Sequence, residues 1–372
     1  MNEQIQFLTE SILQCQQEIQ SLREQNEQQA SEIATMNQTF HVFSEAINNL
    51  INIINNNKTS TEQNEALIQN IITVYQRLEQ SINNVKYEIL DPKLDKSRYF
   101  YPHIIDGSKA IEKIIHERKS IARFGDGEFA IMMNVNRQKF QKNDDRLSKR
   151  LIEVLNSELS DLLIGIADNY GSLEKYNTGS AIGIRLYITQ EVRDAHQKLL
   201  NPNRQYYDAY LSRPYVLYKD NNTSAPKERF QHLQQIWENR DVIFVEGALT
   251  RLGVGNDLFA NARSIKRIIA PATNSFDKYD EILSAALQYG TKDSLFLLAL
   301  GPSACVLAYD LCINGFQAVD IGHVDLEYEW FLQGIGTRTA VPHKYNNEFQ
   351  GGNVVEDIDD PVYQSQIICT FA

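Results

Sequence analysis

Apolar residues in the first 90 positions of the chain recur in steps of three and four, with polar residues between them. This spacing is the heptad pattern of a coiled coil, and the segment contains no Gly or Pro that would interrupt a helix. We therefore expect an α-helical coiled coil over residues 1–90 that joins copies of the chain into a homo-oligomer or recruits another enzyme. The stretch 55–63 favours a helical hairpin, but the apolar series on its two sides stay in phase, so one continuous helix is the alternative.

Residues 91–102 have the composition of a linker, since Pro92 ends the helical pattern. From residue 103 to residue 372, short apolar runs alternate with amphipathic stretches of helical period. This alternation predicts a Rossmann-like α/β domain with a mostly parallel sheet and flanking helices. The expected strands are 120–124, 162–167, 208–212, 242–246, 266–270, 295–300 and 318–322, and the expected helices are 146–157, 228–239, 279–290 and 304–315.

The composition narrows the classes of function. Apolar residues make up 42% and aromatic residues 10% of the 372 positions, which is enough for a large buried core. A net charge of −12 argues against a dedicated nucleic-acid-binding protein, which would carry basic patches. The four cysteines are widely spaced, so neither a structural zinc site nor a disulfide framework is expected. Because the sequence has no long apolar run and no basic leader followed by an apolar stretch, we expect a cytoplasmic protein without a transmembrane segment.

Polar segments follow all seven expected strands. In a parallel α/β sheet the carboxyl ends of the strands lie at one edge, and ligands bind there. We therefore expect a polar, concave site at that edge of the sheet. The segments are GDGE (125–128), DNYGS (168–172), RPY (213–215), GALTRLGVGND (247–257), PATNSF (271–276), GPSA (301–304) and HVDLEYE (323–329).

Asp126 and Glu128 stand two residues apart on an expected glycine loop, directly after a strand and next to Arg123. Hard divalent cations such as Mg²⁺ and Mn²⁺ prefer oxygen ligands and leave room for substrate phosphates. The two glycines would let the backbone bend and approach a ligand closely. We interpret the two carboxylates as metal ligands, and a solvated acidic turn is the alternative.

His323, Asp325, Glu327 and Glu329 alternate along the chain directly after another expected strand. In an extended stretch these four side chains would share one face. A second acidic segment at the same sheet edge favours a metal site or a general base, and His323 is also suited to bind a phosphate or a sugar hydroxyl. A structural histidine beside an acidic edge is the alternative.

Two further segments contain glycines and are candidates for phosphate binding. GPSA opens an expected helix, and the free N–H groups at a helix N-terminus attract anions, which singles out Gly301 and Ser303. TRLGVGND (250–257) lacks the third glycine of a dinucleotide fingerprint, so we interpret it as a loop that brings Arg251, Asn256 or Asp257 to a nucleotide. The sequence contains neither a P-loop motif nor a serine-hydrolase elbow.

The motifs ARFGDGEF, LSRPY, TRLGVGNDLF, PATNSFDKYDEI, LALGPSACVLAYDL and DIGHVDLEYEW occur in this order. Together they resemble the bacterial glycosyltransferases of the GT-D fold, over roughly residues 95–350 and without the coiled coil. The resemblance implies a Rossmann-like fold, a nucleotide-diphosphate sugar donor such as UDP-glucose, and a divalent metal. It also implies that Asp126 and Glu128 form the D-x-E motif of the family, that His323 and Glu329 match its histidine and acidic residue, and that Lys344 in PHKYNNE contacts the diphosphate.

The leading hypothesis is a metal-dependent transferase that moves a hexose, most simply glucose, from a UDP-sugar to a glycan or glycoprotein acceptor in bacterial surface glycan synthesis. A metal on the diphosphate would stabilise the leaving group, and a carboxylate would take the acceptor's proton if the enzyme inverts. A metal-dependent phosphohydrolase or nucleotidase and a non-catalytic scaffold are the alternatives. The predicted catalytic residues are His323, Asp325 and Glu329, the metal ligands Asp126, Glu128 and Glu329, and the nucleotide-sugar-binding residues Arg123, Gly125, Arg213, Arg251, Asn256, Asn274, Gly301, Ser303 and Lys344.

Overall fold

A computed structural model describes residues 99–371 of the chain, except 136–139, 347 and 349–350. The predicted coiled coil over 1–90 and most of the predicted linker therefore lie outside the described residues.

The chain divides into two compact units. One comprises residues 1–100 and 182–193, and the other comprises residues 101–181 and 194–372. The second unit contains every described strand and every predicted site residue.

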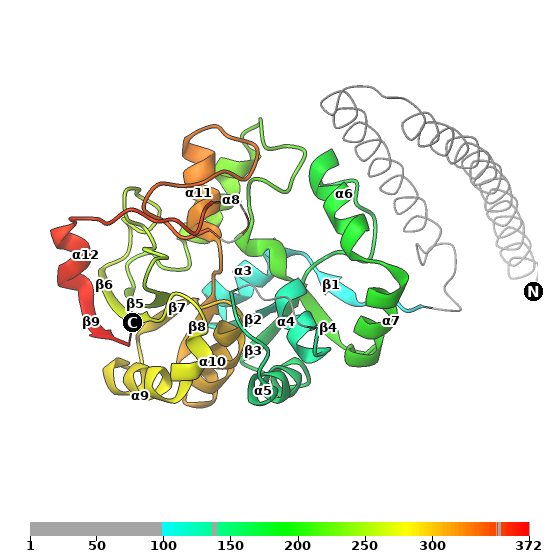
Figure 1. Cartoon of the computed structure of the whole chain (residues 1–372), viewed down its shortest axis with the longest axis horizontal. Coiled ribbons are helices and arrows are strands. Elements are labelled where there is room, and N and C mark those ends of the chain that lie inside the picture. The colour runs from blue at the N-terminus through cyan, green and yellow to red at the C-terminus, as the bar shows by residue number, and fades with distance from the viewer. Residues whose placement is uncertain (1–98, 136–139, 347, 349–350, 372) are drawn as a thin grey trace, which may run out of the picture. The chain divides into compact units, whose positions relative to one another are not determined.

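Within the described residues, nine strands form one sheet in the order β1-β4-β3-β2-β8-β7-β5-β6-β9 (Figure 1). All neighbouring strands run parallel, so the carboxyl ends of all strands lie at one edge. The Rossmann-like parallel α/β prediction is confirmed. The strands are β1 (His103–Ile105), β2 (Ser120–Phe124), β3 (Leu162–Ile166), β4 (Gln205–Asp208), β5 (Asp241–Gly247), β6 (Ser264–Ala270), β7 (Leu295–Ala299), β8 (Gln317–Asp320) and β9 (Ile367–Thr370).

The strand order changes direction between β2 and β8, at the centre of the sheet. Strands β3 and β4 extend the sheet from β2 on one side, and β7, β5, β6 and β9 extend it from β8 on the other. Ligands of open parallel sheets bind beyond the carboxyl ends of the strands at such a switch point. The fold therefore favours the segments that follow β2 and β8 as the walls of a binding site.

Six of the seven expected strands agree with observed strands to within two residues at either end. The strand expected over 208–212 is wrong, because β4 ends at Asp208 and Ala209–Ser212 form a 3₁₀ helix. The Asp208 carboxylate accepts a hydrogen bond from the backbone N–H of Tyr210 at 2.9 Å and so caps this helix. The edge strands β1 and β9 have three and four residues and are too short to give a clear apolar pattern.

Helices cover both faces of the sheet (Figure 1). Helices α3, α8 and α11 share one hydrophobic core with one face of the strands, and α10 packs against β2 and β8 from the opposite face, beside α5 and α9. All four expected helices occur, as α5, α8, α9 and α10. The helices are α3 (Gly107–His116), α4 (Asp126–Met132), α5 (Asp145–Leu155), α6 (Thr178–Tyr187), α7 (Gln190–Leu199), α8 (Ala225–Gln234), α9 (Tyr279–Tyr289), α10 (Pro302–Ile313), α11 (Val324–Leu332) and α12 (Pro361–Gln366).

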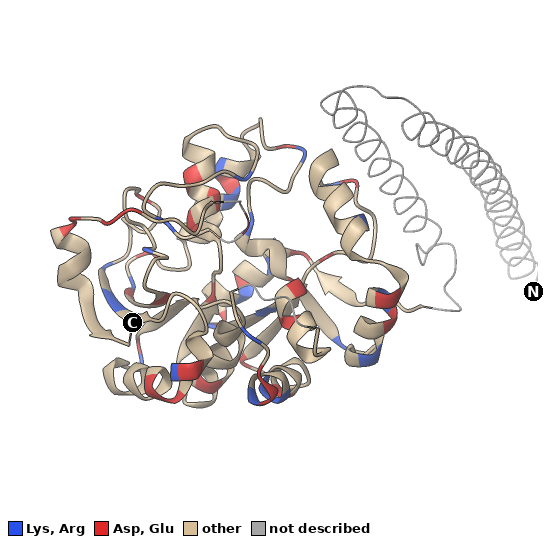
Figure 2. Cartoon of the chain, in the orientation of Figure 1, with Lys and Arg blue, Asp and Glu red and all other residues tan. Residues whose placement is uncertain are grey.

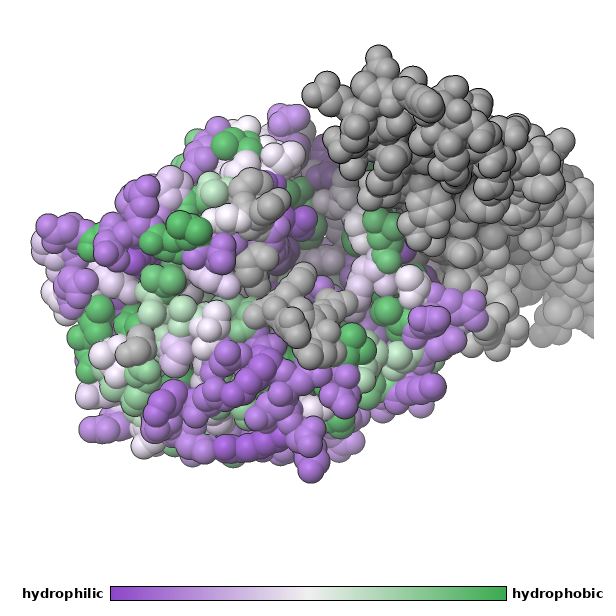
Figure 3. Space-filling view, in the orientation of Figure 1, coloured by the Kyte–Doolittle hydropathy of each residue, from purple (hydrophilic) through white to green (hydrophobic). Residues whose placement is uncertain are grey.

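The outer surface mixes charges of both signs. In the view of Figure 2, acidic and basic positions are interspersed over the outer helices, among them α5. Figure 3 shows hydrophilic residues covering the same side over α5 and α9, with smaller hydrophobic patches among them. In the part of the chain that the structure describes, no helix has both the length and the apolar composition needed to cross a membrane.

A buried ion pair joins the neighbouring strands β5 and β6. Glu246 accepts a hydrogen bond from Nη1 of Arg267 at 2.5 Å and another from the backbone N–H of Leu252 at 2.7 Å. Arg267 also donates to the carbonyl of Leu252 at 2.9 Å. Because Leu252 opens the loop that carries Asn256, the pair fixes both the sheet and one wall of the site described below.

We predict that Arg267→Met destabilises the fold by about 3–5 kcal/mol, because it leaves the Glu246 carboxylate buried and unpaired. Arg263→Met is the matched control, since Arg263 pairs with Asp241 on the surface, and it should change stability little. Urea unfolding of both variants measures the difference, and equal losses of stability would contradict the prediction.

Candidate active site

Arg123 links the carboxyl ends of β2 and β8 to the 3₁₀ helix that follows β4. Its Nε donates to the carbonyl of Asp320 at 2.7 Å, and its Nη2 donates to the Asp320 carboxylate at 2.6 Å. Its Nη1 donates to Oγ of Ser212 at 2.7 Å and to the carbonyl of Ala209 at 3.3 Å. All three guanidinium nitrogens therefore have protein acceptors, so the geometry makes Arg123 an organiser of the site. Its direct contact with a nucleotide sugar stays a prediction.

Gly322 gives the Arg123 guanidinium its space. The backbone of Gly322 has a φ of +45°, and a Cβ at this position would lie 2.1 Å from Nη2 of Arg123. A side chain here would therefore be strained in the backbone and would also push the guanidinium away from Asp320.

We predict that Gly322→Ala destabilises the protein by more than the roughly 1–3 kcal/mol that a left-handed backbone alone costs, because the new Cβ displaces Arg123. Gly334→Ala is the control, since Gly334 has a φ of +67° and no described atom outside its immediate neighbours lies within 4 Å of the place a Cβ would take. Chemical denaturation of both variants gives the comparison, and a smaller loss for Gly322→Ala would contradict it.

The GDGE segment forms the start of helix α4, so the expectation of a loop is wrong. Gly125 is the N-cap residue, and Glu128 accepts a hydrogen bond from the Gly125 N–H at 2.7 Å, which is one of the two bonds of a capping box. Asp126 is exposed and Glu128 is partly buried. Residues two apart in a helix do not face one another, so these carboxylates do not form the symmetric clamp that a loop would allow.

Burial raises the pKa of Glu128 to about 7, and the neighbouring carboxylates of Asp320 and Asp126 act in the same direction. The hydrogen bond from the Gly125 N–H opposes this shift. Glu128 therefore sits in an electronegative environment that a bound cation would relieve.

The HVDLEYE segment forms the start of helix α11, with His323 as the N-cap residue, so the expectation of an extended stretch is also wrong. In a helix, Asp325 and Glu329 are four residues apart and share a face, whereas Glu327 points elsewhere. The structure accordingly divides the four side chains between two polar clusters.

The first group, here called the Lys344 cluster, consists of Asn256, Asp325, Glu329 and Lys344. Nζ of Lys344 lies 2.5 Å from Oδ2 of Asp325 and 3.0 Å from Oε1 of Glu329. Nδ2 of Asn256 donates to Asp325 at 2.8 Å and to Glu329 at 2.7 Å. Asp325 also accepts from the Gly253 N–H at 3.0 Å, and both Asp325 and Lys344 are almost fully buried. Four of the predicted site residues thus come together, and both oxygens of Asp325 are already paired.

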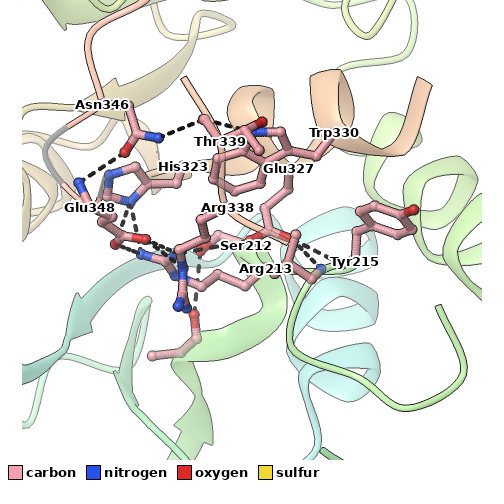
Figure 4. Close-up of polar contacts among 12 residues, drawn as sticks. Ser212, Arg213, Tyr215, His323, Glu327, Trp330, Arg338, Thr339, Asn346 and Glu348 are labelled. Atoms are coloured by element: carbon pink, nitrogen blue, oxygen red, sulfur yellow. Dashed lines mark hydrogen bonds and ion pairs between the residues drawn. The ribbon is translucent and has the colours of Figure 1, made fainter. Parts of the chain in front are cut away.

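The second group, here called the Arg213 cluster, consists of Arg213, His323, Glu327, Arg338 and Glu348 (Figure 4). Arg213 donates to both oxygens of Glu348, at 2.8 Å for Oε2, and contacts Nδ1 of His323 at 3.0 Å. Nε of Arg338 lies 3.0 Å from the Glu348 carboxylate. The Glu327 carboxylate is fully buried, accepts from the backbone N–H groups of residues 215 and 216, and lies 3.8 Å from Arg213.

His323 is neutral in this setting. Burial lowers the pKa of His323 to about 4, and the guanidinium groups of Arg213, Arg123 and Arg338 lower it further against the opposing charge of Glu348. Because Nδ1 accepts from Arg213, the proton of the neutral imidazole lies on Nε2. His323 therefore offers a donor N–H, which suits a phosphate or sugar oxygen.

We predict that stability falls as the pH falls from about 6.5 to about 4, because the unfolded chain protonates His323 in this window and the folded chain does not. His323→Gln removes this contribution, so the pH profile of the variant should be flatter by up to about 1.4 kcal/mol per pH unit. Thermal unfolding of both proteins between pH 4 and pH 7 measures it, and parallel profiles would contradict the prediction.

The other predicted residues of the TRLGVGND segment bind the chain itself. The buried Arg251 donates to the backbone carbonyls of His343 at 2.9 Å and Glu356 at 2.6 Å. The Asp257 carboxylate accepts from the hydroxyl of Tyr328 at 2.7 Å. Arg251 therefore holds the C-terminal part of the chain in place, and a contact with a nucleotide stays a prediction.

The remaining predicted residues of the site are Asn274, Gly301 and Ser303, and each of them contacts other parts of the chain. Asn274 accepts a hydrogen bond from the N–H of Lys142 at 2.8 Å. Gly301 has a φ of +56°, and a Cβ there would lie 2.6 Å from the Phe140 ring. The Ser303 hydroxyl is fully buried and bonds the hydroxyl of Ser275 at 2.9 Å. The start of α10 is thus covered by an aromatic ring, and phosphate binding at this helix stays a prediction.

Sequence reasoning missed three members of the site. Asp320 closes β8 and stands in the sequence as part of an apolar run, whereas in the structure it receives Arg123. Arg338 lies in a stretch without an expected helix or strand, and Glu348 ends the PHKYNNE motif, in which Lys344 is the predicted site residue. The position of Glu348 in that motif is the one signal that the sequence offers for it.

A divalent cation needs more oxygen ligands than the carboxylates of Asp126 and Glu128 provide. In the described part of the chain, no three or more His, Cys, Asp and Glu side chains are grouped as a metal site. Metal ligation by Asp126 and Glu128 stays a prediction, and substrate phosphates and water would have to complete the coordination of the cation.

Comparison with solved structures defines the class of this fold. A structure described as a new glycosyltransferase (DUF1792) from Streptococcus sanguinis matches with a TM-score of 0.69 and 34% identity, over 73% of this chain and 100% of that chain. A second, described as a domain of unknown function 1792 with a distinct glycosyltransferase fold, matches with a TM-score of 0.68 and 30% identity, over 78% of this chain and 99% of that chain. The sheet and its helices therefore have a glycosyltransferase fold.

Sequence comparisons identify the family. The probable glycosyl transferase Gly of Streptococcus gordonii is 35% identical over 270 residues, and glycosyltransferase GlyD of Streptococcus pneumoniae serotype 4 is 36% identical over 261 residues. The matches cover 72% and 70% of this chain but 39% and 31% of those relatives, so the chain spans less than two-fifths of their length. The family model of the GT-D glycosyltransferase fold matches residues 121–349. The chain belongs to the GT-D fold family of glycosyltransferases.

Proposed function

We propose that the chain is a metal-dependent hexosyltransferase of the cytoplasm. It takes a sugar, with glucose as the first choice, from a UDP-sugar and transfers it to a glycan or glycoprotein acceptor in bacterial surface glycan synthesis. The observation that carries the proposal is the pairing of an acidic helix start after β2 with the two guanidinium groups of the Arg213 cluster beside β8, at the switch point of the sheet.

The two walls of this site lie within electrostatic reach of each other. Burial raises the pKa of the Tyr210 hydroxyl, the charge of Arg213 lowers it, and the charge of Asp126 raises it. Arg123, at the end of β2, donates to the Asp320 carboxylate at the end of β8 at 2.6 Å. A sugar nucleotide placed between the walls would meet carboxylates on one side and guanidinium groups on the other. This is the charge arrangement that a cation-bound diphosphate requires.

The chemistry follows from the leaving group. Glycosyl transfer expels a nucleoside diphosphate, and negative charge develops on its departing oxygen. Asp126 and Glu128 would hold the Mn²⁺ or Mg²⁺ ion, whose contribution is to neutralise that charge. Arg213 and the N–H of His323 would donate hydrogen bonds to the diphosphate oxygens. A contact of Lys344 with the diphosphate would compete with its pairing to Asp325 and Glu329.

Glu329 is the better of the two candidates for a general base. Asp325 is buried with both oxygens paired, whereas the side chain of Glu329 is 13% exposed and its described contacts all fall on Oε1. The second oxygen is the atom that would accept the acceptor's proton if the enzyme inverts. This role replaces the predicted contact of Glu329 with the metal in our proposal, because Lys344 and Asn256 already bind it.

We predict that the protein releases UDP from one donor in a panel of UDP-sugars, that this release needs Mn²⁺ and stops with EDTA, and that Asp126→Asn lowers its rate about 10²–10³-fold. Asp145→Asn is the matched control, since Asp145 is an exposed aspartate in the first turn of α5, and it should keep the wild-type rate.

Three outcomes would contradict the proposal. Equal rates for Asp126→Asn and Asp145→Asn would remove Asp126 from the site. Release of inorganic phosphate from nucleotides in place of UDP would indicate a phosphohydrolase. Nucleotide binding in calorimetry without turnover, across the donor panel and with glycan and protein acceptors present, would indicate a scaffold.

A further inference from the structure

One carboxylate of the chain occupies the centre of the Arg213 cluster. Both oxygens of Glu348 accept hydrogen bonds from Arg213, Nε of Arg338 lies 3.0 Å from Oε2, and Nδ1 of His323 lies 3.8 Å from Oε1. These groups come from three separate segments, after the 3₁₀ helix, at the start of α11 and beyond α11, and they converge on Glu348 (Figure 4). The arrangement is that of an anion site whose occupant is part of the chain.

A chain of hydrogen bonds positions Glu348. The backbone N–H of Glu348 donates to Oδ1 of Asn346 at 2.9 Å, and Asn346 is fully buried. Nδ2 of Asn346 donates to the carbonyl of Thr339 at 3.2 Å, and the same carbonyl accepts from the indole of Trp330 in α11 at 3.1 Å. The carboxylate is therefore carried to the cluster by a network anchored in α11 (Figure 4).

The charges of the cluster balance only with Glu348 in place. Arg213 and Arg338 carry two positive charges, His323 is neutral, and the carboxylates of Glu327 and Glu348 supply the negative charges. Although burial acts against it, the guanidinium groups of Arg213 and Arg338 hold the pKa of Glu348 well below its usual range. A guanidinium group binds carboxylate and phosphate oxygens in the same bidentate way. A diphosphate would therefore accept hydrogen bonds from the same N–H groups of Arg213 and Arg338.

We propose that the Glu348 carboxylate competes with the diphosphate of the sugar donor for one binding site. This site is formed by Arg213, Arg338 and His323. Binding of the donor then requires that its diphosphate replace the Glu348 carboxylate on the two guanidinium groups. The proposal rests on the proposed function for the nature of the ligand, and it adds Arg338 to the residues that bind the diphosphate.

Calorimetric titration of the full chain with inorganic pyrophosphate, in the absence of divalent cations, tests the proposal. Glu348→Gln keeps the shape of the side chain and removes its charge, so pyrophosphate should bind about tenfold tighter than to the wild type. Arg338→Gln should bind it about tenfold more weakly than the wild type. Asp241→Asn is the matched control, since it removes a carboxylate from an arginine pair at the amino end of β5, and it should leave the affinity unchanged.

Affinity that is equal or weaker in Glu348→Gln overturns the proposal, because Glu348 would then position Arg213 rather than compete with the ligand. Absence of pyrophosphate binding in all variants also overturns it. Circular dichroism identifies a variant that fails to fold, and Glu348→Ala then takes the place of Glu348→Gln with the same expected gain.

The UDP-release assay separates this proposal from the proposed function. Tighter pyrophosphate binding by Glu348→Gln without UDP release by the wild type would support the competitor and contradict the transferase. UDP release with unchanged pyrophosphate affinity would support the transferase and overturn the competitor.

Discussion

The geometry of the site depends on the hydrogen bonds between the Arg123 guanidinium and Asp320. The guanidinium binds the backbone and the carboxylate of Asp320, and so joins the carboxyl ends of the two central strands β2 and β8. Its third nitrogen holds the 3₁₀ helix that leads into Arg213. Because α4 begins directly after β2 and α11 begins directly after β8, this one side chain sets where the acidic helix start and the Arg213 cluster lie relative to each other.

The segment after α11 contributes at least one charged residue to each of the two polar clusters. Lys344 lies between Asp325 and Glu329, and Glu348, four residues later, lies between Arg213 and Arg338. A buried lysine between two carboxylates is costly unless all three stay paired, so this segment is held in one place by its own charges. The electrostatics of the site therefore depend on a part of the chain that belongs to no strand of the sheet.

The sheet was predictable from the sequence because its central strands are buried on both faces. Strands such as β3 and β7 then appear as continuous apolar runs, whereas the short edge strand β1 has no such pattern. The starts of α4 and α11 resemble a loop and an extended stretch in the sequence. Each helix begins through a few local bonds that polar composition does not reveal, namely the bond from the Gly125 N–H to Glu128 in α4 and the bond from the Glu327 N–H to the His323 carbonyl in α11.

The grouping of the site residues was only partly predictable. The parallel fold places the candidates at the carboxyl edge as expected, since strand ends of a parallel sheet share one edge. Which side chains touch depends on register and on packing across the sheet. Arg123 meets Asp320 at a separation of 197 residues along the chain, and Arg213 meets Glu348 at a separation of 135 residues. Sequence spacing carries no information on contacts of this kind, so the roles of Arg338 and Glu348 emerge only from the structure.

A crystal structure with UDP and Mn²⁺ is the most direct test of a donor site at the switch point of the sheet. Anomalous scattering of manganese should place the ion beside Asp126 at the start of α4, with the diphosphate reaching Arg213 and His323 beyond the carboxyl ends of β2 and β8. UDP and manganese bound elsewhere would contradict this site, for example in the pocket of about 240 Å³ beside α12 that Leu252 and Tyr363 help to line.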